Sequence, residues 1–183
     1  MKNLASFLFE VGMLKRTPRT GFQFLGSGAE SVAEHSFRTA MIGYTLAQID
    51  GQVDVARVIQ LCLFHDIPEA RTGDLNYVNK KYVKVDEMKA VDDLAAQLPF
   101  GDDYRQTLVE FNTRETPEAL IANDADQLEM ILALKEHKDL GNRNADEWFP
   151  FSIERLKTEA ARQLAASIWS TDSSKWWFDD DTD

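Results

Sequence analysis

Residues 31–51 read SVAEHSFRTAMIGYTLAQIDG, and this stretch decides the fold class. Ser31 and Glu34 form a capping box, in which a hydroxyl and a carboxylate bind the first free amides of a helix. Apolar residues then recur at three- and four-residue spacing, and Gly51 is typical of a helix C-terminus. The stretch therefore predicts an amphipathic helix from Ser31 to about Ile49.

The same periodicity extends over most of the chain and predicts further helices, separated by segments rich in glycine and proline. These helices cover approximately residues 4–14, 53–65, 81–98, 102–112, 117–140 and 151–169. The alternation of apolar and polar residues that marks a strand is not convincing anywhere. We therefore expect an all-α single domain of six or seven helices over residues 1–170, followed by an acidic tail over residues 171–183.

Composition and charge limit the partners of this chain. Its 183 residues carry 20 Lys and Arg against 31 Asp and Glu, for a net charge of −11. So acidic a protein gains little from counterion release on a polyanion, and we expect no nucleic acid polymer as a partner. No apolar run approaches the roughly 20 residues that span a bilayer. The single cysteine, Cys62, excludes a disulfide framework. We expect a cytoplasmic protein that does not enter the membrane.

Two of the three histidines are predicted to converge. The chain rises about 21 Å along the first of two neighbouring helices after His35 and returns about 18 Å along the next helix before His65. An antiparallel helix pair therefore brings both imidazoles to nearly the same level, each on an apolar helix face. Pro68 ends the second helix near His65, which allows Asp66 to turn toward the same point.

Two imidazoles and a carboxylate would supply three ligands to a divalent metal ion. A fourth ligand could come from Asp124 or Asp126, which face about 200° apart on the helix predicted over residues 117–140, so that only one of them can reach the ion. The alternative is that each histidine is a hydrogen-bonded core residue. His137 lies about 16 Å further along the same helix than Asp126 and is expected to lie outside the site.

Several motifs together resemble the HD-domain metal-dependent phosphohydrolases. They are SVAEHS at 31–36, FHDIPE at 64–69 and Gly73-Asp74. Within that family the chain is most similar to the small 5′-deoxynucleotidases, which hydrolyse deoxynucleoside 5′-monophosphates, because LKRTPRTG at 14–21 and DQLEM at 126–130 also match. The resemblance covers about residues 4–170 and implies a single HD-domain helical bundle.

The resemblance also implies a metal centre. The positions that match the family's ligands are His35, His65, Asp66 and Asp126, so the resemblance favours Asp126 over Asp124. One divalent ion is implied per site. A mixed set of nitrogen and oxygen donors suits Mn²⁺, Co²⁺, Fe²⁺ or Zn²⁺, with Mg²⁺ also possible.

Further positions are implied on the substrate side. Glu69 matches an acidic residue that handles the nucleophilic water or the leaving group, and Asp74 matches a carboxylate at the sugar side. Arg19 matches an arginine that contacts the phosphate. Relatives place a tryptophan shortly after this arginine, where it is associated with rejecting a ribose 2′-hydroxyl. This chain has Phe22 instead, so strict selectivity for deoxyribose is not predicted.

We therefore predict a metal-dependent phosphomonoesterase that converts deoxynucleoside 5′-monophosphates to deoxynucleoside and phosphate. One alternative is a broader phosphohydrolase that acts on other small phosphate esters or on triphosphates. Another is a non-catalytic nucleotide-binding module. Similar proteins form dimers, and a homodimer is expected. The aromatic residues Trp176, Trp177 and Phe178 are expected to pack on the body of the protein or on a partner protomer.

Overall fold

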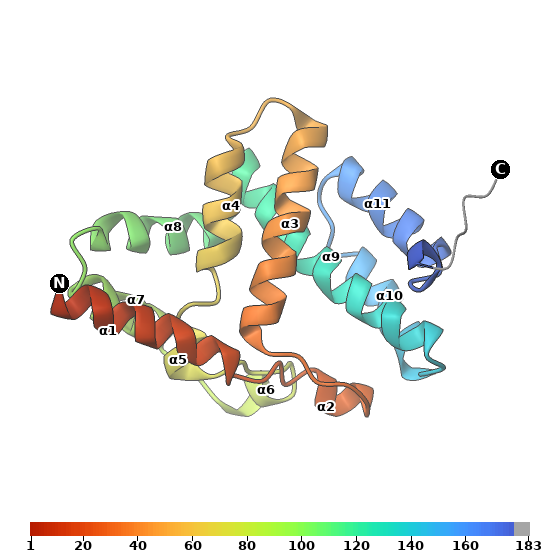
Figure 1. Cartoon of the computed structure of the whole chain (residues 1–183), viewed down its shortest axis with the longest axis horizontal. Coiled ribbons are helices and arrows are strands. Elements are labelled where there is room, and N and C mark those ends of the chain that lie inside the picture. The colour runs from red at the N-terminus through yellow and green to blue at the C-terminus, as the bar shows by residue number, and fades with distance from the viewer. Residues whose placement is uncertain (178–183) are drawn as a thin grey trace.

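Residues 1–177 are described by the structure, a computed structural model (Figure 1). Over this range the chain forms helices joined by turns and loops and contains no β-strand, so the all-α prediction is confirmed. At the centre, α3 (Val32–Asp50) and α4 (Val55–Phe64) form an antiparallel pair, and both pack against the long helix α9 (Pro117–Asp139). These three helices position the candidate site.

Helices α1, α7 and α8 flank these three on one side and α10 and α11 on the other, and α2, α5 and α6 lie below α3 in this view (Figure 1). Their bounds are α1 Lys2–Val11, the 3₁₀ helix η1 Gly12–Lys15, α2 Phe22–Leu25, α5 Glu69–Thr72, α6 Asn79–Tyr82, α7 Glu87–Ala95, α8 Gly101–Thr113, α10 Asn144–Ile153, α11 Glu159–Ser170 and the 3₁₀ helix η2 Lys175–Trp177. The described helices therefore outnumber the six or seven predicted. None of the helices within residues 1–177 is both long and apolar enough to cross a membrane.

The prediction of one helix over residues 81–98 was wrong. The chain there forms α6 and α7, with extended backbone at Val83 between them (φ −116°, ψ 124°). Asp86 begins α7, because its side chain accepts a hydrogen bond from the amide of Lys89. An aspartate at this position satisfies one of the amides that a helix start leaves free, so a new helix begins here.

The prediction of one helix over residues 151–169 was also wrong. Helix α10 begins earlier and contains Pro150, while α11 begins after Thr158. The proline removes a backbone donor, and α10 ends within one turn of it. The side chain of Thr158 accepts a hydrogen bond from the amide of Ala161 and so caps the start of α11.

The capping box predicted at the start of α3 is present. Ser31 Oγ accepts a hydrogen bond from the amide of Glu34 at 3.3 Å, and the amide of Ser31 donates to Glu34 Oε2 at 2.7 Å. Gly51 ends the helix in the left-handed conformation, at φ 72°, which glycine adopts without strain. These signals fix the length of α3 and the level at which His35 enters the core.

Helices α3 and α4 approach each other closely at Gly43. A Cβ atom on this residue would lie 2.6 Å from Cys62 Sγ and 3.1 Å from a methyl group of Val58. Glycine therefore permits the observed separation of the two helices. Leu61 and Leu128 are fully buried in the same core, and each buried leucine stabilises the fold by about 2 kcal/mol.

The aromatic residues near the C-terminus do not all pack as expected. Trp176 and Trp177 contact each other edge to face in η2. Trp176 is 79% exposed, so it does not pack on the body of the protein, and its packing on a partner protomer stays a prediction. Phe178 and the terminal aspartates of the predicted tail lie outside the described residues.

Candidate metal centre and substrate cavity

Two imidazole rings meet at one end of the α3–α4 pair. His35 lies in the first turn of α3 and is fully buried, and His65 directly follows α4 as its C-cap. The two ring centroids are 5.5 Å apart. The structure therefore brings both rings to one level, as the antiparallel helix pair predicts.

Two carboxylates lie between these rings. Asp66 Oδ2 is 3.4 Å from His35 Nε2 and 3.2 Å from His65 Nε2. Asp126 Oδ1, on α9, is 3.2 Å from His35 Nε2 and 3.9 Å from His65 Nε2. Ligands of a small divalent ion lie about 2.0–2.2 Å from it and hence about 3–3.5 Å from each other. The structure thus brings the four predicted ligands together at separations that suit one common cation.

The hydrogen bonds of the two imidazoles orient their Nε2 atoms toward the carboxylates. His65 Nδ1 donates to the carbonyl oxygen of Cys62 at 2.8 Å, and His35 Nδ1 donates to Glu129 Oε2 at 2.6 Å. Carbonyl and carboxylate oxygens only accept, so in each neutral ring the lone pair is on Nε2. This is the orientation that metal-binding histidines require.

The donor set also fits a cation because some of its atoms are otherwise unsatisfied. His65 Nε2 and Asp66 Oδ2 are buried and find no hydrogen-bond partner within residues 1–177. A buried polar atom without a partner costs about 1–3 kcal/mol. A cation at the point where both atoms meet would remove that cost, so the residues present fit a divalent metal ion.

Neighbouring charges, rather than burial, determine the direction of the pKa shifts in this cluster. Burial disfavours a charged imidazole, but Asp126, Glu129 and Asp66 outweigh it and raise the pKa of His35 to about 10. Burial likewise opposes charge on Asp126, but the two histidines and Arg19 hold the pKa of that carboxyl far below its usual range. The metal-free cluster therefore holds a proton on His35, and a cation must displace it.

Glu129 orients the ring of His35 by a hydrogen bond to Nδ1. It was not among the site residues predicted from the sequence. It is fully buried on α9 and accepts hydrogen bonds from Arg38 Nε at 3.0 Å and Arg38 Nη2 at 2.7 Å. The signal in the sequence is its position three residues after Asp126, which places both carboxylates on one helix face. Because Arg38 and His35 hold the carboxylate from two sides, its orientation is fixed.

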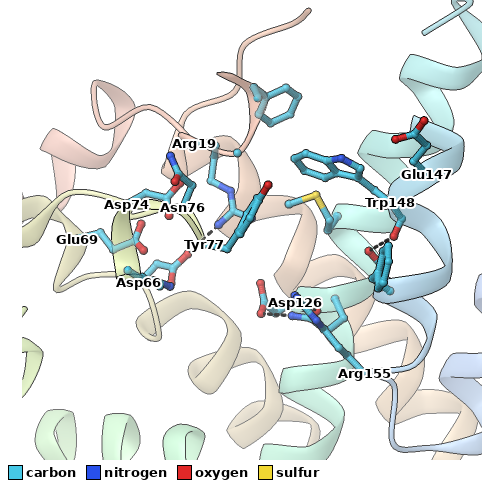
Figure 2. Close-up of a pocket in the computed structure, with 17 residues that line it drawn as sticks. Arg19, Asp66, Glu69, Asp74, Asn76, Tyr77, Asp126, Glu147, Trp148 and Arg155 are labelled. Atoms are coloured by element: carbon cyan, nitrogen blue, oxygen red, sulfur yellow. Dashed lines mark hydrogen bonds and ion pairs between the residues drawn. The ribbon is translucent and has the colours of Figure 1, made fainter. Parts of the chain in front are cut away.

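A cavity of about 780 Å³ opens beside this cluster (Figure 2). All four residues that the sequence assigns to the substrate side line it, namely Arg19, Phe22, Glu69 and Asp74. Asp66 and Asp126 line it as well. Two of the four predicted metal ligands and all the predicted substrate-side residues thus line one cavity, and His35 and His65 contact the two aspartates from outside its lining.

Arg19 reaches the cluster because the loop that carries it is tied to the start of α3. The amide of Arg19 donates to the carbonyl of Glu30 at 2.8 Å. Its guanidinium Nη1 lies 3.6 Å from Asp66 Oδ2. Burial opposes the charge, but Asp66 and Asp126 outweigh it and raise the pKa of Arg19 above its usual value. Arg19 therefore brings a permanent positive charge to the rim of the cluster.

Glu69 and Asp74 differ in their surroundings. Glu69 Oε2 is buried and finds no hydrogen-bond partner among the described residues. Burial, followed by the charges of Asp66 and Asp74, raises the pKa of Glu69. Asp74 Oδ2 instead accepts a hydrogen bond from the amide of Thr20 at 2.6 Å. Asp74 therefore ties down the loop that carries Arg19, a role that the sequence did not predict.

Asp124 and His137, two further residues of α9, lie apart from the cluster. Asp124 accepts hydrogen bonds from the amides of Lys157 and Thr158, at 2.8 and 2.7 Å, and from Thr158 Oγ1. It therefore anchors the start of α11. His137 contacts the ring of Phe22 and lies within hydrogen-bonding distance of Ser27 Oγ.

Several lining residues were not predicted. They are Gly21, Asn76, Tyr77, Lys80, Gln127, Met130, Glu147, Trp148, Phe151, Ser152 and Arg155. Asn76 is buried, and its Nδ2 has no partner in residues 1–177. Gln127 Nε2 donates to Asp126 Oδ2 at 2.8 Å. This bond leaves Asp126 Oδ1 as the oxygen that faces the histidines.

The fold and the site together define a class: an all-α protein with a buried imidazole–carboxylate cluster, suited to a divalent cation, at the wall of a cavity lined by charged and aromatic side chains. A family model described as HD domain matches residues 11–169, and the chain belongs to this family.

Known proteins resemble the chain over most of its length. The 5′-deoxynucleotidase HDDC2 of Danio rerio is 32% identical over 186 residues, which cover 91% of this chain and 92% of that protein. A conserved hypothetical protein from Pyrococcus furiosus has a similar structure, with a TM-score of 0.78, 30% identity and coverage of 90% of this chain and 98% of that chain. A predicted metal-dependent phosphohydrolase from Magnetospirillum magnetotacticum has a TM-score of 0.70, 27% identity and coverage of 92% of both chains.

Proposed function

We propose that the protein is a metal-dependent phosphomonoesterase that hydrolyses deoxynucleoside 5′-monophosphates to deoxynucleoside and inorganic phosphate. One observation carries the proposal: the Nε2 atoms of His35 and His65 meet the carboxylates of Asp66 and Asp126 beside a cavity that also holds Arg19. The similarity to proteins named 5′-deoxynucleotidase supports this substrate class.

The metal ligands in this proposal are His35, His65, Asp66 and Asp126. One divalent ion is bound per site, and Mn²⁺, Co²⁺, Fe²⁺ and Zn²⁺ suit the donor set, with Mg²⁺ also possible. When bound, such an ion lowers the pKa of a coordinated water and neutralises charge on the phosphoryl group. Glu129 and Cys62 keep the two imidazoles in the required orientation.

The other residues bind the phosphate ester and move a proton. Arg19 binds phosphate oxygens that are not attacked, with two parallel hydrogen bonds from its guanidinium. Glu69 positions the attacking water or donates a proton to the departing 5′-oxygen, and its buried, unpartnered Oε2 in the cavity wall supports this role. Asp74 borders the sugar while it holds the Arg19 loop in place. Phe22 lines the cavity. The family resemblance implies a tryptophan shortly after Arg19, and both sugar types therefore need testing.

Phosphate release from a panel of deoxy- and ribonucleoside 5′-monophosphates tests the proposal. With Mn²⁺ or Co²⁺ added, we expect turnover of the deoxynucleotides and its loss in His65→Ala. Lys89→Ala is the control, because this exposed side chain pairs with Asp93 on α7, away from the cluster and the cavity, and it should keep its activity. A protein that gives no metal-dependent turnover, or that gives pyrophosphate from triphosphates instead of phosphate from monophosphates, contradicts the proposal. Thermal stabilisation by nucleotides without any product identifies a binding module.

We also infer that the protein forms a homodimer. Phe37, Met41 and Tyr44 recur at helical spacing on the outer face of α3 and are 69%, 52% and 43% exposed. A two-fold dimer would bury such a stripe against its own copy. Sedimentation at micromolar concentration should give a dimer that Met41→Glu dissociates. A wild-type monomer contradicts the inference.

The same proposal places the protein in the cytoplasm, without nucleic acid polymers as partners. The net charge of −11 supports the second point, because a strongly acidic protein is repelled by phosphate backbones. Filter binding with duplex DNA and RNA at low salt should show no retention. Fractionation of cells tests the location.

A further inference from the structure

The cavity has two ends of different chemistry. Arg19, Asp66 and Glu69 line one end. At the other end Phe22, Met130 and Trp148 present aromatic and thioether surface to the same space. Figure 2 shows the indole ring of Trp148 across the cavity from Glu69 and Asp66. With a cation held by Asp66 and Asp126 beside the charge of Arg19, the first end would bind an anionic group. A ligand that fills the cavity would therefore have one anionic end and one flat apolar end.

The apolar end is held rigidly by the fold. Phe22, Met130 and Trp148 all pack against a small buried cluster formed by Leu25, Leu134 and Ala145. One side of these residues is therefore fixed by packing, and the other side faces the cavity. A preorganised surface of this kind loses little entropy when it binds a ligand.

The apolar end also lies at a suitable distance from the metal cluster. Met130 follows Asp126 by four residues on α9, so the two positions lie on one helix face, about 6 Å apart along the axis. A Cβ atom on Gly21 would lie 3.9 Å from the Trp148 ring and 4.0 Å from Met130 Cε. The loop that carries Arg19 therefore runs directly beside the apolar end.

We propose that Phe22, Met130 and Trp148 form the nucleobase subsite of the enzyme and that the base stacks on the indole of Trp148. The inference rests on the proposed function, because it assumes that a nucleotide is the substrate. Every base has a π-face, and stacking on an aromatic side chain is a general mode of base binding. Trp148 is then a specificity-determining residue that distinguishes nucleotides from phosphate esters without a base.

Two substrates that differ only in the base test the inference. They are dAMP and 2-deoxyribose 5-phosphate, which share the phosphate and the sugar. Loss of stacking should raise the KM for dAMP with little change in kcat. In Trp148→Leu, which keeps apolar volume without a flat ring, we expect the ratio of kcat/KM for dAMP to that for 2-deoxyribose 5-phosphate to fall about 10-fold. Trp148→Phe should restore most of the ratio, and Trp176→Ala, a matched control far more exposed to solvent, should leave it unchanged.

Calorimetric binding of deoxyadenosine to the metal-free protein gives a readout that does not depend on turnover. We expect Trp148→Leu to weaken this binding about 10-fold, and thermal unfolding confirms that the variant is folded. If Trp148→Leu lowers kcat/KM equally for both substrates, the base subsite is overturned. It is also overturned if neither the ratio of kcat/KM values nor deoxyadenosine binding changes. If the wild type hydrolyses neither substrate, the proposed function fails, and deoxyadenosine binding still decides whether Trp148 contacts a base.

Discussion

At the scale of single residues, the candidate centre depends on a buried contact between His35 and Glu129. Glu129 is held on its other side by Arg38, which also donates to Glu136 at 2.6 Å. The charge of Glu129 makes the imidazole a stronger donor to a cation and fixes its ring plane. The geometry of a metal site therefore extends beyond the atoms that would touch the metal.

Glu129→Gln should weaken metal binding about 10- to 100-fold, because the amide still accepts the Nδ1 hydrogen bond but carries no charge. Titration calorimetry with Mn²⁺ measures the effect. Glu136→Gln is the matched control, since Glu136 contacts the same arginine but is half-exposed and distant from the imidazole. Equal affinities in the two variants would show that Glu129 does not support the site.

Metal binding should release protons. The pKa of His35 is raised to about 10 in the metal-free protein, so the ring holds its extra proton at neutral pH and must lose it to bind a cation. Metal affinity should therefore increase as the pH rises from 6 to 9. Protons should appear in solution as the ion binds, from His35 and also from His65, because burial opposes charge on that ring but Asp66 outweighs it and raises the pKa of His65. Calorimetry in buffers of different ionisation enthalpy counts these protons. Affinity that does not depend on pH would contradict this reading of the cluster.

Sequence reasoning places the two histidines well but resolves less of their surroundings. The rise of a helix per residue and the end of a helix at Pro68 follow from the local sequence. Together they suffice to bring His35, His65 and Asp66 close to one another. The choice between Asp124 and Asp126 depends on the rotation of α9 against its neighbours, which packing decides. In the structure Asp126 faces the histidines, whereas Asp124 faces the start of α11.

At the scale of the helices, the close approach of α3 and α4 sets the separation of His35 and His65. Gly43→Ala forces a methyl group against Cys62 Sγ, which a Cβ would meet at 2.6 Å. We expect a loss of about 1–3 kcal/mol in the free energy of unfolding and weaker metal binding. Chemical denaturation measures the first effect and calorimetry the second.

The matched control for that change is Gly12→Ala. A Cβ on Gly12 meets nothing within 4 Å among the described residues, and the backbone there is helical (φ −61°). Alanine should therefore be neutral or slightly stabilising at this position. A Gly43→Ala protein as stable as Gly12→Ala would contradict the proposed close contact.

The helix boundaries explain why part of the cavity was missed. Trp148 lies on α10, a helix that the sequence did not predict, because the last predicted helix starts at residue 151. Pro150 and Thr158 are both boundary signals, but only the fold shows that α10 runs through Pro150 and ends three residues after it, and that α11 begins after Thr158. The apolar end of the cavity could therefore not be assembled from sequence, although Arg19, Glu69 and Asp74 could be identified through the family resemblance.

At the scale of the whole molecule, a cation at the centre would link three separate parts of the chain. The predicted ligands come from α3, from the turn after α4 and from α9. Helices α3 and α9 pack in one core, whereas Ile67 of the turn packs in a second. An ion that binds only the folded state stabilises it, by about 2.7 kcal/mol at a concentration 100 times its Kd. Removing the ion should therefore lower the Tm.

Thermal unfolding of metal-free protein with increasing Mn²⁺ measures this stabilisation. We expect the Tm to rise with metal concentration in the wild type and to stay constant in the double variant His35→Ala, His65→Ala. Because the double variant keeps the rest of the acidic surface, it is also the control for ions that bind elsewhere. A rise of the same size in both proteins would show that the ion is held somewhere other than the histidine cluster.

The central claim is that His35, His65, Asp66 and Asp126 bind one common cation, and anomalous diffraction from crystals of the Mn²⁺-bound protein tests it most directly. We expect one strong anomalous peak per chain, about 2.0–2.3 Å from both Nε2 atoms and from one oxygen of each aspartate. A peak that is distant from these four side chains, or crystals of active enzyme without a peak between them, would contradict the claim.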